Sequence, residues 1–321
     1  MNNLPTEIMV IILDLLDFKS QMKFIFVSKI NIQLSKYWVI NEKIHVNKKV
    51  LGWPYYDNLI NIKINGLLKV YPKKLRCLSF STCFNESVDK LPLSIKSIKF
   101  GYYFNQSVDK LPPSIKTLEF GHCFDQSVDK LPPSIKTLEF GHCFDQSVDN
   151  LPSGARSVRQ NLVFPENEIR RKPSSIKSIK FGYWFNQRVD KLPLSIKSIK
   201  FGRCFNQSVS KLPSTVTYLE IGMKFNQPLE HIPSSVTHLI INCERLNGKI
   251  PETVTHLTIH CSQYKKHISQ SITHLTIIGI ELKNKNIPKT VIHMTLDTFI
   301  DIIIPETVKT LIVNGKNIKK R

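Results

Sequence analysis

The sequence predicts an α+β protein, in which a small head of three helices precedes a repeat solenoid with a parallel β-sheet on one face and mostly non-helical returns. Residues 111–130 and 131–150 are identical except that Asn150 replaces Lys130. Self-similarity at a period of about twenty residues is typical of a solenoid. Residues 4–29 do not follow this repeat, and their apolar residues have the spacing of an amphipathic helix.

The predicted head covers residues 1–45. The first helix has an apolar stripe at positions i, i+3, i+4, i+7 and i+8, formed by Ile8, Ile11, Ile12, Leu15 and Leu16. Pro5 suits the first turn of this helix, and Glu7 suits its positive dipole end. Residues 22–27 predict a second short helix and residues 32–38 a third.

Each repeat unit predicts one short strand followed by a turn. In the unit that begins at Leu91, the strand has Ile95, Ile98 and Phe100 as its buried residues, the last two alternating as a half-buried strand requires. Gly101 then provides a residue that can take the left-handed conformation of a tight turn. The turn prolines recur 20 or 21 residues apart, at Pro92, Pro112, Pro132, Pro152, Pro173, Pro193, Pro213 and Pro233.

Equivalent residues of successive units are expected to stack in columns, because one unit cannot bury its apolar face alone. A phenylalanine column is predicted from Phe84, Phe104, Phe124, Phe144, Phe164, Phe185, Phe205 and Phe225, continued by Leu246. The next residue of each unit is Asn or Asp, whose short side chain bonds neighbouring backbone groups in turns. We expect this second column to tie one coil to the next.

The repeat pattern divides the rest of the chain. Residues 46–80 form a linker and the first solenoid strands, with the sheet starting near Leu59. Residues 81–313 form about twelve repeat units, of which residues 151–172 are degenerate. Residues 314–321 are a basic tail.

The residues between the core positions of each strand are expected to point outward on the sheet face, which is the usual partner-binding surface of such solenoids. Two outward columns are predicted, and Ser157 and Arg159 of the degenerate unit belong to them. The side chains expected to bind a target are Lys99, Glu119, Glu139, Lys180, Lys200, Tyr218, Glu220, His238, His256, His274 and His293.

The four histidines of this face could sit side by side, and imidazoles are good zinc ligands. An evenly spaced ladder does not converge on one tetrahedral point, however, so no metal site is predicted. Acid is expected to weaken this half of the solenoid, because charged imidazoles repel one another. Cys123 and Cys143 occupy the same position in adjacent units and could approach bonding distance, but reduced thiols are favoured.

Several function classes are not expected. We find no catalytic motif, glycine-rich phosphate loop or Cys-x-x-Cys pair, so neither an enzyme nor a cofactor is predicted. The formal net charge of +20 invites a nucleic-acid interpretation, but Glu119, Glu139 and Glu220 interrupt the basic residues. No apolar run approaches the ~20 residues of a membrane-spanning helix. The expected location is the cytoplasm or nucleus.

The repeat resembles the shortest leucine-rich repeats and, more specifically, the FNIP repeat. Residues 225–239, FNQPLEHIPSSVTHL, carry the resemblance best, and it extends over roughly residues 80–313. Many proteins with this repeat come from amoebae and giant viruses, so the resemblance implies a viral or amoebal protein, in the host cytoplasm if viral. It also implies a leucine-rich-repeat-like surface for protein partners.

The amino terminus resembles an F-box, on the residues Leu4-Pro5, Glu7-Ile8, Ile12-Leu13, Leu16-Asp17, Lys19 and Val27-Ser28-Lys29. Two positions depart from that pattern: Asn31 stands where many F-boxes have Trp, and Gln21 where an apolar residue is usual. The resemblance implies that the segment docks on the Skp-type adaptor of a cullin-RING ubiquitin ligase. The adaptor-facing residues would be Leu4, Pro5, Ile8, Ile12 and Leu16. The chain would then be a substrate receptor whose solenoid holds a protein target. The alternatives are a helical cap that closes the solenoid and a scaffold without a ubiquitin role.

Overall fold

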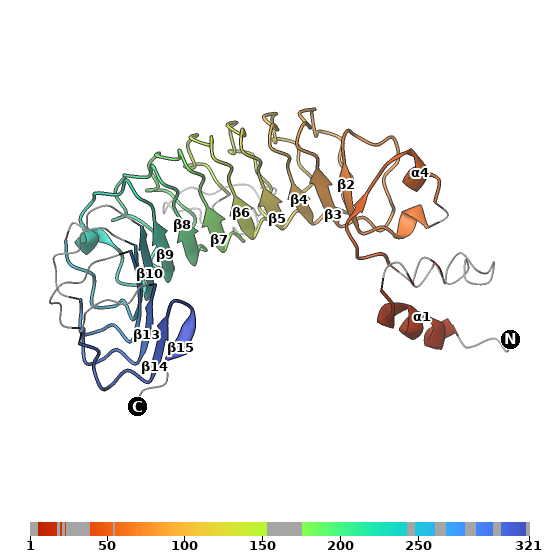
Figure 1. The fold of residues 1–321 in the computed structure, drawn as a ribbon. Helices are drawn as coiled ribbons and strands as arrows, with labels where there is room; N and C mark the ends of the chain where they lie inside the picture. Colours follow the sequence, from red (N-terminus) through yellow and green to blue (C-terminus); the bar gives the residue numbers. More distant parts are fainter. Residues whose placement is uncertain are drawn as a thin grey trace, which may run out of the picture.

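The computed structural model describes residues 6–17, 20, 23, 39–53, 55–152, 175–242, 248–260, 268–279, 287–297 and 303–318. The chain is a β-solenoid of about twelve turns. The strands of the described residues join in one fifteen-stranded sheet and follow one another in chain order. Figure 1 shows an arch whose inner, concave side carries the strands and whose outer side carries the return segments.

The strands are short because each coil passes the sheet face only briefly before it turns. Strands β1 to β14 run parallel to one another, and β15 is antiparallel to β14. The strands are β1 (Ile44–His45), β2 (Asn61–Ile64), β3 (Cys77–Phe80), β4 (Ser97–Lys99), β5 (Thr117–Glu119), β6 (Thr137–Glu139), β7 (Ser178–Lys180), β8 (Ser198–Lys200), β9 (Tyr218–Ile221), β10 (His238–Asn242), β11 (His256–His260), β12 (His274–Ile278), β13 (His293–Leu296), β14 (Thr310–Val313) and β15 (Lys316–Ile318).

The prediction of an α+β protein with a three-helix head is wrong. The described helices are α1 (Thr6–Leu15), the one-turn α4 (Lys48–Leu51) and the 3-10 turns η2 (Tyr56–Asn58) and η3 (Leu229–His231). The helical residues of the described part amount to about 7% of the chain. The second and third predicted helices lie, except for Lys23, outside the described residues.

The amino-terminal end of the sheet is covered by residues 39–53 and 55–58 rather than by a described helical head. Ile44 of β1 pairs in parallel with Ile62 of β2, so the sheet begins within the range predicted as the head. Val46, Val50, Tyr55 and Tyr56 are buried beside it. The first coil of a solenoid has no preceding coil, so its apolar core would be exposed at that end unless other residues covered it. These side chains cover it.

The core contains a pair of phenylalanine columns, which run beside columns of buried Ile, Leu and Val. The predicted column is confirmed. From Phe84 to Phe225, the centroids of neighbouring described rings lie 6.0 to 6.2 Å apart. A second column, whose rings lie 3.6 to 4.0 Å from the first within each coil, comes from the strand ends at Phe80, Phe100, Phe120, Phe140, Phe181 and Phe201. Phe164 and Leu246, which the prediction included, lie outside the described residues.

The predicted Asn/Asp column also ties neighbouring coils together. The side-chain oxygen of Asn85 accepts hydrogen bonds from the backbone N–H of Asn105 at 2.8 Å and from the side-chain amide of Gln106 at 3.2 Å. The same pattern continues from Asn105 to Asp125. Each coil thereby satisfies a turn N–H that water would otherwise have to satisfy.

Gly101 and its equivalents are required for a reason that differs from the prediction. Described glycines with positive φ are Gly248, Gly279 and Gly315, so Gly101 is not left-handed. A Cβ added to Gly121 would instead lie 1.7 Å from the carbonyl oxygen of Gly101. The backbones of successive coils approach so closely at this turn that a side chain has no room.

Candidate functional site

The two predicted outward columns lie on the concave face of the sheet. Ser97 pairs with Thr117, and Lys99 with Glu119. The same register carries both columns onward through β8 and β9 to Tyr218 and Glu220, and then into the histidines of β10 to β13. β6 pairs directly with β7, and Ser157 and Arg159 lie outside the described residues.

The outward column that contains Lys99 and Glu119 has its charges paired within the column. Lys99 forms an ion pair with Glu119, and Lys180 forms one with Glu139. The Nζ atom of Lys200 lies 3.2 Å from a carboxylate oxygen of Glu220 and 5.3 Å from the centre of the Tyr218 ring. Since every acidic residue of this column has a lysine partner, the glutamates do not offset charges elsewhere on the face.

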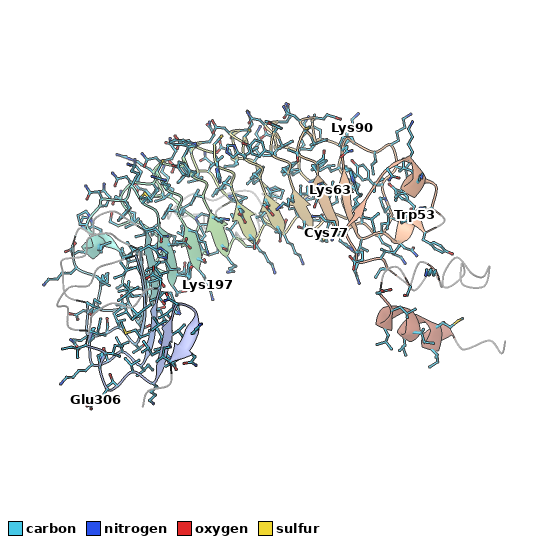
Figure 2. The ribbon with its side chains drawn as sticks, in the orientation of Figure 1. Trp53, Lys63, Cys77, Lys90, Lys197 and Glu306 are labelled. Carbon is cyan, nitrogen blue, oxygen red and sulfur yellow. The ribbon has the colours of Figure 1, made fainter. Side chains whose placement is uncertain are left out.

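A third column, which the sequence analysis did not single out, is uniformly cationic. We call it the basic row, and it consists of Arg76, Lys96, Lys116, Lys136, Lys177 and Lys197. Each of these residues precedes the first residue of a strand. The backbone N–H of each lysine donates to the carbonyl of the preceding member at 2.7 to 2.9 Å, which sets the row in register across six coils. Figure 2 shows Lys197 on the inner side of the arch.

No member of the basic row forms an ion pair with another described residue. Lysines of the return segments differ: Lys110 pairs with Asp89, and Lys130 with Asp109, both at 2.8 Å. The backbones of neighbouring members of the row lie about 4.8 Å apart, the spacing of adjacent strands. Like charges at that distance across a sheet are destabilising, so the row costs the folded protein stability. The signal in the sequence was the Ser-Ile-Lys that recurs directly before β4 to β8.

The four histidines form a stacked ladder at the carboxyl-terminal half of the face. Their ring centroids are 4.1, 4.0 and 4.4 Å apart from His238 through His256 and His274 to His293. Threonine hydroxyls fix the first three rings, and Thr255 Oγ1 lies 2.9 Å from His256 Nδ1. The rings lie side by side, so they do not surround a common point.

The histidine ladder is expected to make the protein less stable in acid. Burial and, after it, the neighbouring imidazoles lower the pKa of His256 and His274 from the usual 6.5. The folded state therefore takes up protons less readily than the unfolded state, and stability is full above pH 6.5 and falls as the pH drops through the folded pKa values. Melting temperatures measured from pH 7.5 to pH 5 should fall more steeply for the wild type than for a His256→Gln/His274→Gln variant. Parallel curves would contradict the expectation.

Only some of the residues predicted to bind an adaptor lie within the described part of the chain. Leu4 and Pro5 lie outside the described residues. On α1, Ile8 is 43% exposed and Ile12 is half-buried, and Leu16, directly after the helix, is also half-buried. Two further apolar residues of the same helix, Ile11 and Leu15, are 55% and 81% exposed. The described part of α1 therefore presents apolar side chains to solvent.

Comparisons with known proteins agree with this architecture. The family model of the FNIP Repeat matches residues 84–123, 104–143, 185–224, 205–244 and 225–262. These matches begin at residue 84 and give no support to the F-box resemblance of the amino terminus. No curated protein sequence matches the chain. None of the helices in the described part of the chain has the length and apolar character that crossing a membrane requires.

Among solved structures, the chain resembles that of CroV588, described as a novel circular LRR protein. The two share 25% sequence identity, and the superposition covers 80% of this chain with a TM-score of 0.54. The chain corresponds to 46% of the length of that protein, which is about half of it. This chain is thus a β-solenoid that carries FNIP repeats and is similar in fold to a leucine-rich-repeat protein.

Proposed function

We propose that this protein is a repeat scaffold that binds a protein partner through its concave face, and that the bound segment of the partner is acidic. The observation that carries the proposal is the basic row. Six cations in register have no carboxylate partner among the described residues, although lysines of the return segments do. A negatively charged partner would remove the repulsion within the row, so the cost in the free protein becomes a gain in the complex.

The dimensions of the row suit an extended peptide. Six coils span five strand spacings of about 4.8 Å, or about 24 Å, which an extended segment of about seven residues covers. The neighbouring column of Ser and Thr residues, among them Ser97 and Thr117, adds hydroxyl groups that can donate to carboxylates and to the peptide backbone.

A protein partner is favoured over a nucleic acid for two reasons. Single-stranded nucleic acids are bound by cationic grooves in which aromatic side chains stack on the bases. The outward residues of β4 to β8 are Ser, Thr, Lys and Glu, without an aromatic residue. In addition, arginine is the residue best suited to phosphate, and five of the six members of the row are lysine.

A charge-reversal experiment tests the proposal. The probe is a fluorescein-labelled peptide of about ten glutamates, and its anisotropy is measured with the full chain at physiological salt. A Lys116→Glu/Lys136→Glu/Lys177→Glu variant should bind the peptide at least about tenfold more weakly, equivalent to about 1.4 kcal/mol. The matched control reverses three exposed lysines of the return segments, Lys69, Lys90 and Lys224, and has the same net charge.

Two outcomes would overturn the proposal. If the control variant loses affinity as much as the row variant does, the binding depends on net charge and not on the row. If a ten-nucleotide oligothymidylate binds through the row more tightly than the peptide does, the face is a nucleic-acid site.

A second candidate function is that of substrate receptor in a ubiquitin ligase, and the apolar residues exposed on α1 favour it. Ile8, Ile11 and Leu15 recur at i, i+3 and i+7, which is the spacing of a helix that docks in an apolar groove. Affinity purification of the tagged chain should then recover the Skp-type adaptor and cullin, and an Ile8→Glu/Ile11→Glu variant should recover neither. The control is Ile303→Glu at the opposite end, where Ile303 is 88% exposed. Equal recovery by all three proteins, or by none, would exclude this role and leave the scaffold.

A further inference from the structure

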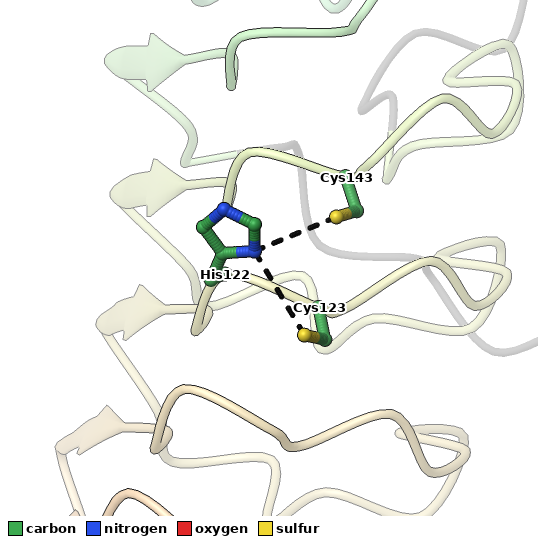
Figure 3. A group of neighbouring side chains, drawn as sticks. All are labelled: His122, Cys123 and Cys143. Carbon is green, nitrogen blue, oxygen red and sulfur yellow. Dashed lines mark hydrogen bonds between the residues drawn. The ribbon is translucent and has the colours of Figure 1, made fainter.

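The turns that follow β5 and β6 bring one imidazole and two thiols together. His122 and Cys123 belong to the first turn, and Cys143 belongs to the second (Figure 3). The Nδ1 atom of His122 lies 3.8 Å from the sulfur of Cys123 and 3.5 Å from the sulfur of Cys143. All three ligand atoms lie within 4.8 Å of one another, and each residue is partly buried.

These distances fit the edges of a tetrahedral zinc site. Zinc binds histidine nitrogen at about 2.0 Å and cysteine sulfur at about 2.3 Å, so in a tetrahedron nitrogen and sulfur ligands are about 3.5 Å apart and two sulfurs about 3.8 Å apart. The two measured nitrogen-to-sulfur distances, 3.5 and 3.8 Å, are close to that value. An ion could therefore enter without a large movement of the three side chains.

The solenoid backbone holds the two turns in place. The N–H of Cys123 donates to the carbonyl of Tyr102, and the N–H of Cys143 donates to the carbonyl of His122, both at 2.9 Å. The ring of Tyr102 stacks on His122 with centroids 4.4 Å apart and planes 13° apart, which restricts the orientation of the imidazole. Ligands on rigid elements, with their rings oriented by neighbours, are what a preformed metal site requires.

Among the described coils, this arrangement occurs where the two identical repeat units adjoin. At the position of Cys123, the preceding coil has Tyr103, and at the position of Cys143, the following described coil has Trp184. Cys83 and Cys204 occupy the same column further along, and each is next to one of these aromatic residues. They are free thiols like Cys123 and Cys143, but each lacks a cysteine in the adjoining coil.

We propose that His122, Cys123 and Cys143 bind one thiophilic divalent cation, of which Zn²⁺ is the prime example, and that the ion clamps the coils of β5 and β6 together. The ligands are His122 Nδ1 and the two thiolate sulfurs, and water takes the fourth position. Binding breaks two S–H bonds, forms two metal–sulfur bonds and one metal–nitrogen bond, and releases two protons and the displaced waters of the ion to solvent, with no change of oxidation state. The motif escapes a search by spacing, because its cysteines are one repeat apart rather than in a Cys-x-x-Cys pair.

Cobalt titration of the full chain tests this site directly. Co²⁺ is added to the protein reduced with a phosphine and kept free of oxygen, and thiolate-to-cobalt charge transfer is read in the near ultraviolet. We expect one equivalent to bind and Zn²⁺ to displace it. Cys123→Ser, Cys143→Ser and His122→Ala should each weaken Co²⁺ binding by more than about tenfold, because the loss of an outer-shell partner alone costs about 10- to 100-fold in affinity.

The matched controls are Cys83→Ser and Cys204→Ser, which each remove a thiol of the same column from a coil that holds no part of the cluster. Both should bind Co²⁺ as the wild type does. Melting curves supply a second readout: added Zn²⁺ should raise the melting temperature of the wild type and the controls and leave that of the three cluster variants unchanged. Circular dichroism confirms that each variant is folded.

Three results would overturn the proposal. The first is the absence of the charge-transfer band from the reduced wild type at excess Co²⁺. The second is an equal loss of binding in Cys204→Ser. The third is binding that survives the cysteine substitutions and disappears in a His256→Gln variant, which would assign the ion to the histidine ladder instead.

Discussion

Replacing Gly121 with alanine is expected to lower the stability of the solenoid by about 3 kcal/mol or more, at the upper end of what overpacking costs. The added Cβ would lie 1.7 Å from the carbonyl oxygen of Gly101 and 3.1 Å from the Cα atom of Tyr102. Both atoms belong to the backbone, so no side chain can rotate away to make room. The two coils would have to separate locally, which would also pull apart the phenylalanine rings beneath them.

Guanidinium unfolding followed by circular dichroism measures this effect as a lower midpoint. The control is Gly52→Ala, because a Cβ there would lie 3.6 Å from the carbonyl oxygen of Lys49, an ordinary contact, and the φ angle of −87° suits any residue. We expect the control to unfold within about 0.5 kcal/mol of the wild type, as neutral surface changes do. A Gly121→Ala protein with an unchanged midpoint would refute the close approach of the coils.

The second large effect is expected from Phe124→Ala, with a loss of about 3 to 5 kcal/mol. Phe124 is fully buried, and its ring lies 3.7 Å from that of Phe120 and 6.0 to 6.1 Å from those of Phe104 and Phe144. Removing the ring leaves a cavity in the middle of the column. The coils on either side cannot collapse into it, because their backbones are held in register by the sheet.

The distribution of this loss along the chain is also informative. A solenoid coil contacts only its neighbours, so hydrogen exchange should accelerate most in the coils of β4 to β6 and least near β12. Tyr103→Ala is the control, since Tyr103 is 53% exposed in an adjacent turn. If exchange accelerates uniformly, the coils unfold as one cooperative unit. If neither stability nor exchange changes, Phe124 is not part of the core.

The candidate face could be anticipated only in part. The alternation within each unit identified Lys99 and Glu119 as outward residues, because a strand sends successive side chains to opposite faces. It did not reveal that these two residues neutralise each other, since an ion pair depends on which coils adjoin. Lys96 could not be assigned to the face for a related reason. It precedes the strand, and the inward–outward alternation of side chains holds only within a strand.

The prediction of a three-helix head failed because a local pattern predicts a helix but not the tertiary contacts of that helix. The apolar stripe does form a helix over residues 8–15, within α1, but several of its apolar side chains are exposed. The residues that cover the amino-terminal end of the sheet are instead Val46, Val50 and Tyr55, whose segment has no strong period of its own. Periodicity predicted the helix correctly and said nothing about what it packs against.

By itself, the sequence determined the period of the solenoid, the buried and outward positions of each unit, and the two columns of Phe and Asn/Asp that link the units. These features can be read from a single repeat unit, because the same positions are buried in every unit. Only the tertiary structure decided that Gly121 faces a carbonyl, that the basic row has no acidic neighbour among the described residues, and that His122 meets Cys123 and Cys143. These are relations between coils, and they depend on the stagger and close approach of one backbone on the next.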